Sequence, residues 1–260
     1  MFHHLRRNPF GLKGHLTRML VVAYAFPEEI LQPLLPQGLT VDTYKGYGFA
    51  AVALTQVKGM RPALLPAWMG MNPFLAGFRI FARFQVPNGP NLRGLYILKS
   101  ISGTRWFCRA GNLLTHYRYE LGTPTWEADA KTWRMEIASP KPELGVRIQV
   151  RVDELEPALP AESPFETWQE ARRFAGPLPF TFDYEMQSHS MLVVDGVREH
   201  WNPRPVAVDS AEINFFKTEI FKGCTPRLAN AFVLEDIPYE WRKGRLIALG
   251  ERTAQEVCNG

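Results

Sequence analysis

The feature of this sequence that most restricts its fold is the repetition of short segments in which apolar and polar residues alternate. Roughly a dozen such segments follow one another, and 21 prolines and 20 glycines are spread between them, which is typical of many short strands joined by turns. Residues 126–137 and 146–152 show the alternation most cleanly. Helices are expected only over residues 27–35, 105–112 and 163–174. The pattern therefore predicts a mainly β fold with minor α content, in one antiparallel, barrel-like domain.

The segment over residues 154–163 is the nearest the chain comes to a linker, because it holds two prolines and three acids. Ser163, Pro164 and Glu166 follow and predict a helix start, with Ser163 as the N-cap. Beyond this helix the strand pattern resumes unchanged. We therefore expect no domain boundary at this point and a single domain over residues 1–260.

Charge, apolar runs and cysteine content restrict the partners and the location. The net charge of +4 is spread without a block of like charges, so no nucleic-acid partner is expected. No apolar run approaches the roughly 18 residues that a membrane-spanning helix needs, and the stretch 19–26 is interpreted as a buried strand. Three distant cysteines form no zinc spacing and favour a reducing, cytoplasmic location.

Sequence motifs for common cofactors and for hydrolytic chemistry are missing. The chain contains no G-x-G-x-x-G, no P-loop, no H-E-x-x-H and no G-x-S-x-G. We therefore expect neither a cofactor nor a metal site.

Cations occupy positions inside apolar strands, and these positions are the clearest sign of a functional site. Arg79 and Arg83 are expected on one face of a strand, because side chains two or four apart point the same way. By the same rule Lys99 shares its face with Leu95 and Ile97. Because a buried charge is costly unless it is paired, such residues either face solvent or form a site.

These cations each have a functional and a structural interpretation. Arg79 and Arg83 could clamp a carboxylate inside the barrel, or they could pair with acids such as Glu120 or Glu136 on an outer face. Lys99 could supply the amine of a Schiff base if neighbouring arginines lower its pKa. Alternatively, its side chain could extend past its apolar neighbours into solvent.

Three further residues, close to one another in the sequence, are candidates for the same site. His116 could act as a general acid–base, because the unperturbed pKa of histidine is about 6.5, or it could be a structural histidine held by a hydrogen bond. Arg109 could contact a ligand or tie a helix to the barrel. Glu120 could orient His116 in a ligand site or pair with Arg118 at the surface.

Five motifs connect the first half of the chain with a known family. They are A-F-P-E-E-I-L-Q-P-L-L-P-Q-G-L (25–39), D-T-Y-K-G-Y-G-F-A-A-V (42–52), R-F-Q-V (83–86), R-G-L-Y-I-L (93–98) and R-A-G-N-L-L-T-H-Y (109–117). Their order resembles the uncharacterised bacterial conserved-domain branch of the acetoacetate decarboxylase-like superfamily. This resemblance implies a single closed, cone-like β-barrel with a few flanking short helices and a central cavity. It also implies a homo-oligomer, because characterised members often self-associate.

The resemblance does not extend to the catalytic lysine of the family. In acetoacetate decarboxylases this lysine forms a Schiff base with a β-keto acid, and it lies seven residues after the arginine of an Arg-Glu step. The matching arginine here is Arg109, the glutamate position holds Ala110, and His116 stands in the position of the lysine. The next residue is Tyr117 rather than a second lysine.

Three functions are compatible with the sequence. The first is a barrel protein that binds a small organic anion, a keto or carboxylic acid, with the arginines as anchors and His116 as acid–base. The second is a lyase or decarboxylase-like enzyme in which Lys99 forms the Schiff base. The third is a non-catalytic structural or interaction protein whose barrel interior is filled by side chains.

Overall fold

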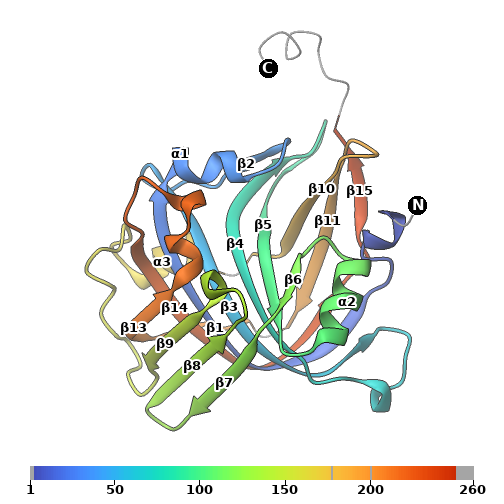
Figure 1. Cartoon of the computed structure of the whole chain (residues 1–260). Coiled ribbons are helices and arrows are strands. Elements are labelled where there is room, and N and C mark those ends of the chain that lie inside the picture. The colour runs from blue at the N-terminus through green and yellow to red at the C-terminus, as the bar shows by residue number, and fades with distance from the viewer. Residues whose placement is uncertain (1–2, 177, 200, 250–260) are drawn as a thin grey trace.

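The structure is a computed structural model of the chain, and it describes residues 3–176, 178–199 and 201–249. It is mainly β, as predicted, with two sheets and a few short helices around them (Figure 1). No helix in this described part of the chain is long and apolar enough to cross a membrane. The helices are α1 (Glu28–Leu31), α2 (Arg105–Leu114) and α3 (Trp168–Ala175), with the 3₁₀ turns η1 (His3–Arg6), η2 (Gln32–Leu34), η3 (Ala67–Met69), η4 (Pro142–Leu144), η5 (Asn214–Lys217) and η6 (Glu219–Phe221).

Within the described residues, eleven strands form a large, strongly curved sheet (Figure 1). Its order is β12-β14-β1-β3-β4-β5-β10-β11-β15, while β2 pairs with β4 and β6 pairs with β5. β11 also pairs with the end of β14, from Gly196↔Trp241 to Arg198↔Tyr239. The strand bounds are β1 (Leu12–Pro27), β2 (Leu39–Val41), β3 (Tyr47–Pro62), β4 (Phe74–Gln85), β5 (Asn91–Ser102), β6 (Tyr119–Leu121), β10 (Phe180–Glu185), β11 (Ser190–Arg198), β12 (Arg204–Pro205), β14 (Arg227–Trp241) and β15 (Arg245–Ala248).

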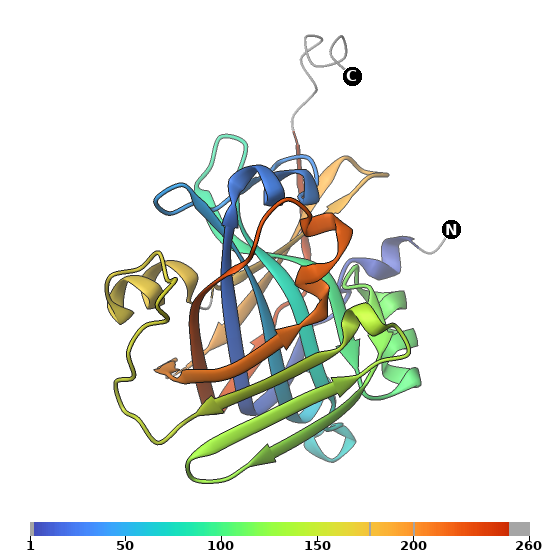
Figure 2. The ribbon, with the colours of Figure 1, turned by 60° about the vertical axis from the view of Figure 1, so that its left-hand side comes forward.

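A smaller antiparallel sheet lies across the outer face of the large one (Figure 2). Its order is β13-β9-β8-β7, and its buried residues Trp133 and Ile148 belong to the same cluster as Leu20 and Phe78 of the large sheet. Along β8 buried and exposed residues alternate, because one face packs on this core and the other meets solvent. Its strands are β7 (Thr123–Ala128), β8 (Thr132–Ala138), β9 (Val146–Arg151) and β13 (Ala207–Ile213).

The strand β1 is covered on both faces, which explains the continuous apolar stretch near the start of the sequence. Leu20 and Val22 pack in the core between the two sheets. Val21 and Ala23 pack in a second core, on the inner side of the curve. A strand that is buried on both faces has no polar alternation, so the interpretation of residues 19–26 as a buried strand is confirmed.

The prediction of a purely antiparallel sheet is wrong at β5. This strand pairs in parallel with β10, from Phe180↔Gly94 to Phe182↔Tyr96, and in parallel with β6. Helix α2 connects β5 to β6 and lies beside both strands (Figure 1). A helix between two strands returns the chain to its starting edge, so that the second strand runs parallel to the first.

The predicted start of the third helix is also wrong, while the helix itself is confirmed. α3 begins at Trp168, and the Thr167 side chain caps it by accepting a hydrogen bond from the Glu170 backbone N–H. Ser163 instead accepts from the backbone N–H of Phe165 and forms a local turn. Both serine and threonine satisfy free N–H groups of nearby backbone, so the sequence offered two candidate caps four residues apart.

Candidate functional site

A cavity of about 130 Å³ lies on the inner side of the curved sheet, and we call it the inner cavity. Most of its wall is apolar and comes from β1, β4, β5 and β14. Strands that are far apart in the sequence therefore meet at this cavity and contribute polar groups to it. The polar side chains in its wall are Thr55, Arg79, Ser100, Tyr117, Tyr119, Thr181, Arg198 and Tyr239.

The guanidinium of Arg79 places a positive charge in the wall of this cavity without an acidic partner among the described residues. Its Nε is buried and has no hydrogen-bond partner, and no carboxylate acts on the guanidinium among the residues that the structure describes. Burial, which disfavours the charged form, lowers the pKa of Arg79 to about 10. The guanidinium is still charged at neutral pH, so its charge is uncompensated.

Three tyrosines surround Arg79, and none of them neutralises it. Burial raises the pKa of Tyr117 to about 12 and also raises the pKa values of Tyr119 and Tyr239. At neutral pH all three therefore carry an O–H group rather than a phenolate. The Tyr117 hydroxyl accepts a hydrogen bond from Asn8 Nδ2 at 3.4 Å. Neutral hydroxyls beside a guanidinium form an environment that suits a bound anion.

Two glycines allow these tyrosines to approach the cavity. A Cβ on Gly111 of helix α2 would lie 2.4 Å from a ring carbon of Tyr119. A Cβ on Gly196 of β11 would lie 2.0 Å from the Tyr239 hydroxyl. Non-bonded contacts of a Cβ atom are essentially never shorter than 3.0 Å, so any larger residue at these two positions would displace the tyrosine ring. The two backbone positions therefore help to fix where the tyrosine rings stand.

Replacing Gly111 by alanine is expected to lower the free energy of unfolding by about 1–3 kcal/mol through overpacking against Tyr119. In a Tyr119→Ala background, the same substitution should be neutral or stabilising, because alanine favours a helix by about 1 kcal/mol over glycine. Urea denaturation of the four proteins in this double-mutant cycle measures the coupling. An equal cost in both backgrounds would show that Gly111 does not position the ring.

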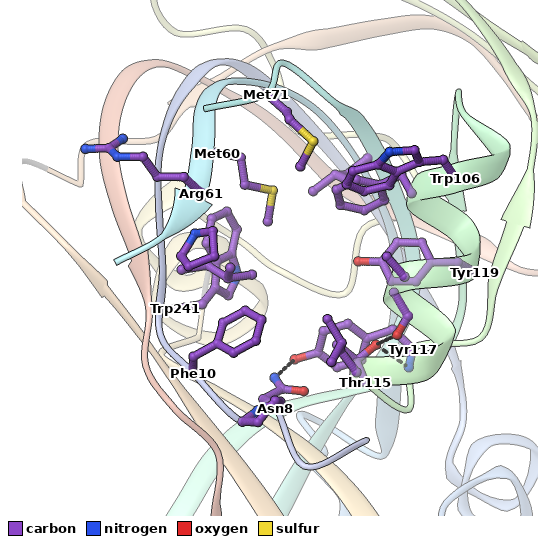
Figure 3. Close-up of a pocket in the computed structure, with 18 of the residues that line it drawn as sticks. Asn8, Phe10, Met60, Arg61, Met71, Trp106, Thr115, Tyr117, Tyr119 and Trp241 are labelled. Carbon is purple, nitrogen blue, oxygen red and sulfur yellow. Dashed lines mark hydrogen bonds between the residues drawn. The ribbon is translucent and has the colours of Figure 1, made fainter. Parts of the chain in front are cut away.

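A second cavity of about 210 Å³ adjoins the inner one, and we call it the outer cavity (Figure 3). The two cavities share Leu75, Tyr117, Tyr119 and Trp241 in their walls. Figure 3 shows the Tyr119 hydroxyl directed into this space, opposite Trp241, and the Tyr117 hydroxyl at its edge, bonded to Asn8. The remaining wall is mainly apolar and includes Phe10, Leu12, Met60, Met71, Trp106 and Phe107.

Arg83 lies on the same face of β4 as Arg79 but outside both cavity walls. Its Nε donates to Asp42 at 2.5 Å, and Arg93 donates to the other oxygen of the same carboxylate at 2.6 Å. The Asp42 side chain is fully buried. The structure therefore separates the two predicted anchors, because Arg83 already has an acid as its partner.

Lys99 points away from the inner cavity, so the predicted face it shares with Ile97 is wrong. A register shift occurs between β4 and β5: Phe78 pairs with Lys99, whereas Arg79 pairs with Ile97. The extra residue at this bulge turns Lys99 to the opposite face, where its Nζ lies 3.5 Å from Glu120. Ile97 remains in the wall of the inner cavity. A Schiff-base role for Lys99 stays a prediction.

Glu120 forms ion pairs with two lysines and does not line a cavity. Its Oε1 accepts a hydrogen bond from Lys141 at 2.7 Å, and this bond is the main cause that lowers the pKa of Glu120. It lines neither cavity. The structure thus brings Glu120 together with Lys99 and Lys141, and not with Arg118 or His116.

His116 and Arg109 flank the cavities without lining them. His116 lies in the loop between α2 and β6, and its Nε2 is buried without a hydrogen-bond partner among the described residues. Burial, followed by the nearby Arg6, lowers the pKa of His116. Arg109 is exposed on α2. Catalytic and ligand-binding roles for these two residues stay predictions.

The pattern of cations in the sequence did not predict the tyrosines of the inner cavity. Tyr117 stands where the family has a second lysine, and Tyr117 and Tyr119 have the two-residue spacing that places side chains on one face. That spacing was the available signal. Tyr239 comes from β14, far along the chain, and no local pattern links it to the other two.

Solved structures with the same fold include an acetoacetate decarboxylase, an acetoacetate decarboxylase-like enzyme and an enzyme of enduracididine biosynthesis. An acetoacetate decarboxylase-like enzyme from Sphingomonas wittichii RW1 is 16% identical, with a TM-score of 0.57 and 94% of each chain covered. Acetoacetate decarboxylase from Legionella pneumophila subsp. pneumophila str. Philadelphia 1 is 8% identical, with a TM-score of 0.63, 92% of this chain and 88% of that chain covered. The enduracididine biosynthesis enzyme MppR, complexed with pyruvate, is 12% identical, with a TM-score of 0.61 and coverage of 92% and 90%.

Comparison at the level of sequence assigns a family. No curated protein matches the chain. A family profile, described as "Uncharacterized conserved protein", matches residues 14–235. This range runs from the start of β1 into β14 and includes most of the strands that line the two cavities. Because this match covers most of the chain, the chain belongs to the DUF2071 family.

Proposed function

We propose that the protein binds a small organic anion, a keto or carboxylic acid, in the inner cavity and that Arg79 is its anchor. The observation that carries this proposal is the charged Arg79 guanidinium, which has a buried Nε and no acidic partner in the described residues. A buried charge without compensation is costly, and a ligand carboxylate would supply the missing negative charge. Guanidinium also matches the two oxygens of a carboxylate in shape.

The neighbouring hydroxyls give this anchor its selectivity. Tyr119 and Tyr239 stay protonated near neutral pH, because burial raises their pKa values. They can donate to a carboxylate or to an adjacent keto oxygen, and Ser100 lines the same wall. MppR, which shares the fold, binds pyruvate, a keto acid of this kind.

The proposal includes the closed barrel that the resemblance implies, as the frame of the cavity. The pairing of β11 with β14 supports it, because these two strands stand next to opposite ends of the strand order. The proposal is one of binding rather than Schiff-base chemistry. Neither cavity has a lysine in its wall among the described residues, and Lys99 lies on the opposite face of β5.

Titration calorimetry with pyruvate and acetate, against the uncharged acetone and acetamide, tests the anchor. We expect the two anions to bind and the neutral analogues not to bind. Arg79→Gln should weaken anion binding by at least tenfold, since charge-assisted hydrogen bonds contribute about 1.5–3 kcal/mol. Arg105→Gln is the matched control, because Arg105 is exposed on α2 and lines neither cavity. Anion binding that survives Arg79→Gln unchanged would reject the proposal.

A further inference from the structure

Several polar groups in the wall of the outer cavity are already engaged by other groups of the protein. The Arg61 guanidinium donates to the carbonyl oxygens of Gly59 and Leu65, and Figure 3 shows it directed away from the cavity. Thr115 donates its hydroxyl hydrogen to the Gly111 carbonyl at 2.8 Å. Asn8 donates to Tyr117. The surface left for a ligand is made chiefly of aromatic rings and methionine side chains.

The two cavities lie side by side and share part of their walls. Leu75, Tyr117, Tyr119 and Trp241 belong to both walls, so the apolar cavity is the direct neighbour of the cavity that holds Arg79. A molecule with its anionic group at Arg79 and more than a few carbon atoms would extend past Tyr119 and Trp241 into the outer cavity. Taken together, the two cavities offer a charged group at the inner end, Arg79, and apolar side chains at the outer end.

We infer that the ligand is a monocarboxylic acid with an apolar tail, whose carboxylate meets Arg79 and whose tail fills the outer cavity. The inference rests on the proposed function and specifies the class of anion. The methionines Met60 and Met71 suit such a tail, because their flexible, polarisable side chains adapt to apolar groups of varied shape. The tail displaces water from the outer cavity, and this burial favours longer acids over acetate.

Affinity should therefore increase with the length of the acid until the outer cavity is filled. Each methylene that is buried contributes about 0.8 kcal/mol, which corresponds to about a fourfold gain in affinity. Titration calorimetry with acetate, butanoate, hexanoate and octanoate measures this series on the full chain. The alcohols of equal length serve as probes of tail burial without the charge, and they should bind more weakly than the acids.

A pair of variants on helix α2 tests where the tail lies. Ala110 lines the outer cavity, so Ala110→Trp should fill it and remove the gain, leaving octanoate no tighter than acetate. Leu113 is on the same helix, is 48% exposed and lines neither cavity. Leu113→Trp should keep the full dependence on chain length.

The outcomes separate this inference from the proposed function. Acids that gain affinity with length in the unmodified protein and in Leu113→Trp, but not in Ala110→Trp, support the inference. Affinities that stay flat with length, or a gain that persists in Ala110→Trp, overturn it, while Arg79-dependent binding of acetate leaves the proposed function standing. If alcohols bind as tightly as acids, or Arg79→Gln leaves every acid unaffected, the proposed function fails as well.

Discussion

Replacing Arg79 by methionine is expected to raise the free energy of unfolding by about 1–4 kcal/mol, because buried charges are often less favourable than apolar groups of similar volume. The same substitution should abolish anion binding. The Arg79 guanidinium has no acidic partner, and burial lowers its pKa to about 10, so folding confines a charge that water would solvate better. A residue that destabilises the fold yet lines a cavity is typical of a binding site.

Arg83→Met is the matched control for this prediction, on the same face of the same strand. Arg83 donates to the buried Asp42, so its loss should lower the free energy of unfolding by about 1.5–3 kcal/mol. Urea denaturation of both variants at neutral pH compares them directly. If Arg79→Met destabilises the protein as much as Arg83→Met does, the Arg79 charge is compensated in solution and the argument for an anion loses its basis.

Asp183→Asn is expected to stabilise the protein at pH 8 by about 4 kcal/mol and to have little effect at pH 4. Asp183 lies on β10 and is only 3% exposed. One of its oxygens accepts a hydrogen bond from the Tyr184 backbone N–H at 2.8 Å, while Oδ2 is buried without a partner in the described residues. Burial raises the pKa of Asp183 to about 7, against an ordinary value of 3.8.

The direction of this pH effect follows from which state binds the proton. Between about pH 4 and pH 7 the folded protein holds a proton on Asp183 that the unfolded chain has released. Stability therefore declines as the pH rises through this window, and the asparagine variant, which has no carboxyl to ionise, should not show that decline. Parallel denaturation curves from pH 4 to pH 8 measure the difference. A constant difference at all pH values would mean that Asp183 ionises as readily in the folded protein as in the unfolded chain.

Alternation along the sequence correctly predicted the strands that form the site. The strands expected to carry Arg79 and Lys99 are β4 and β5, and they pair with each other antiparallel. The face of β4 that carries Arg79 was also predicted correctly, because Gly77, Arg79 and Phe81 follow one another at two-residue spacing in the wall of the inner cavity. A period of this kind is a local property, and the sequence shows it directly.

What alternation could not supply was the partner of each charged side chain. Arg83 pairs with Asp42, whereas the sequence offered Glu120 and Glu136. Lys99 left its expected face because the register of β5 shifts by one residue, and nothing in the residues 95–101 marks that bulge. Partners and bulges depend on which strands become neighbours, and that depends on the whole sheet.

The pairing of β1 with β14 determines the order in which this fold can be completed. β1 is paired along one edge with β3, which follows it closely, and along the other with β14, from Leu12↔Trp241 to Ala25↔Arg227. During synthesis β1 and β3 leave the ribosome together, but the second edge of β1 has no partner until nearly all the described chain has been made. Folding therefore depends on contacts between distant segments, which are slow to form. The nascent chain carries an open, apolar strand edge throughout that delay, and such an edge invites pairing with other chains.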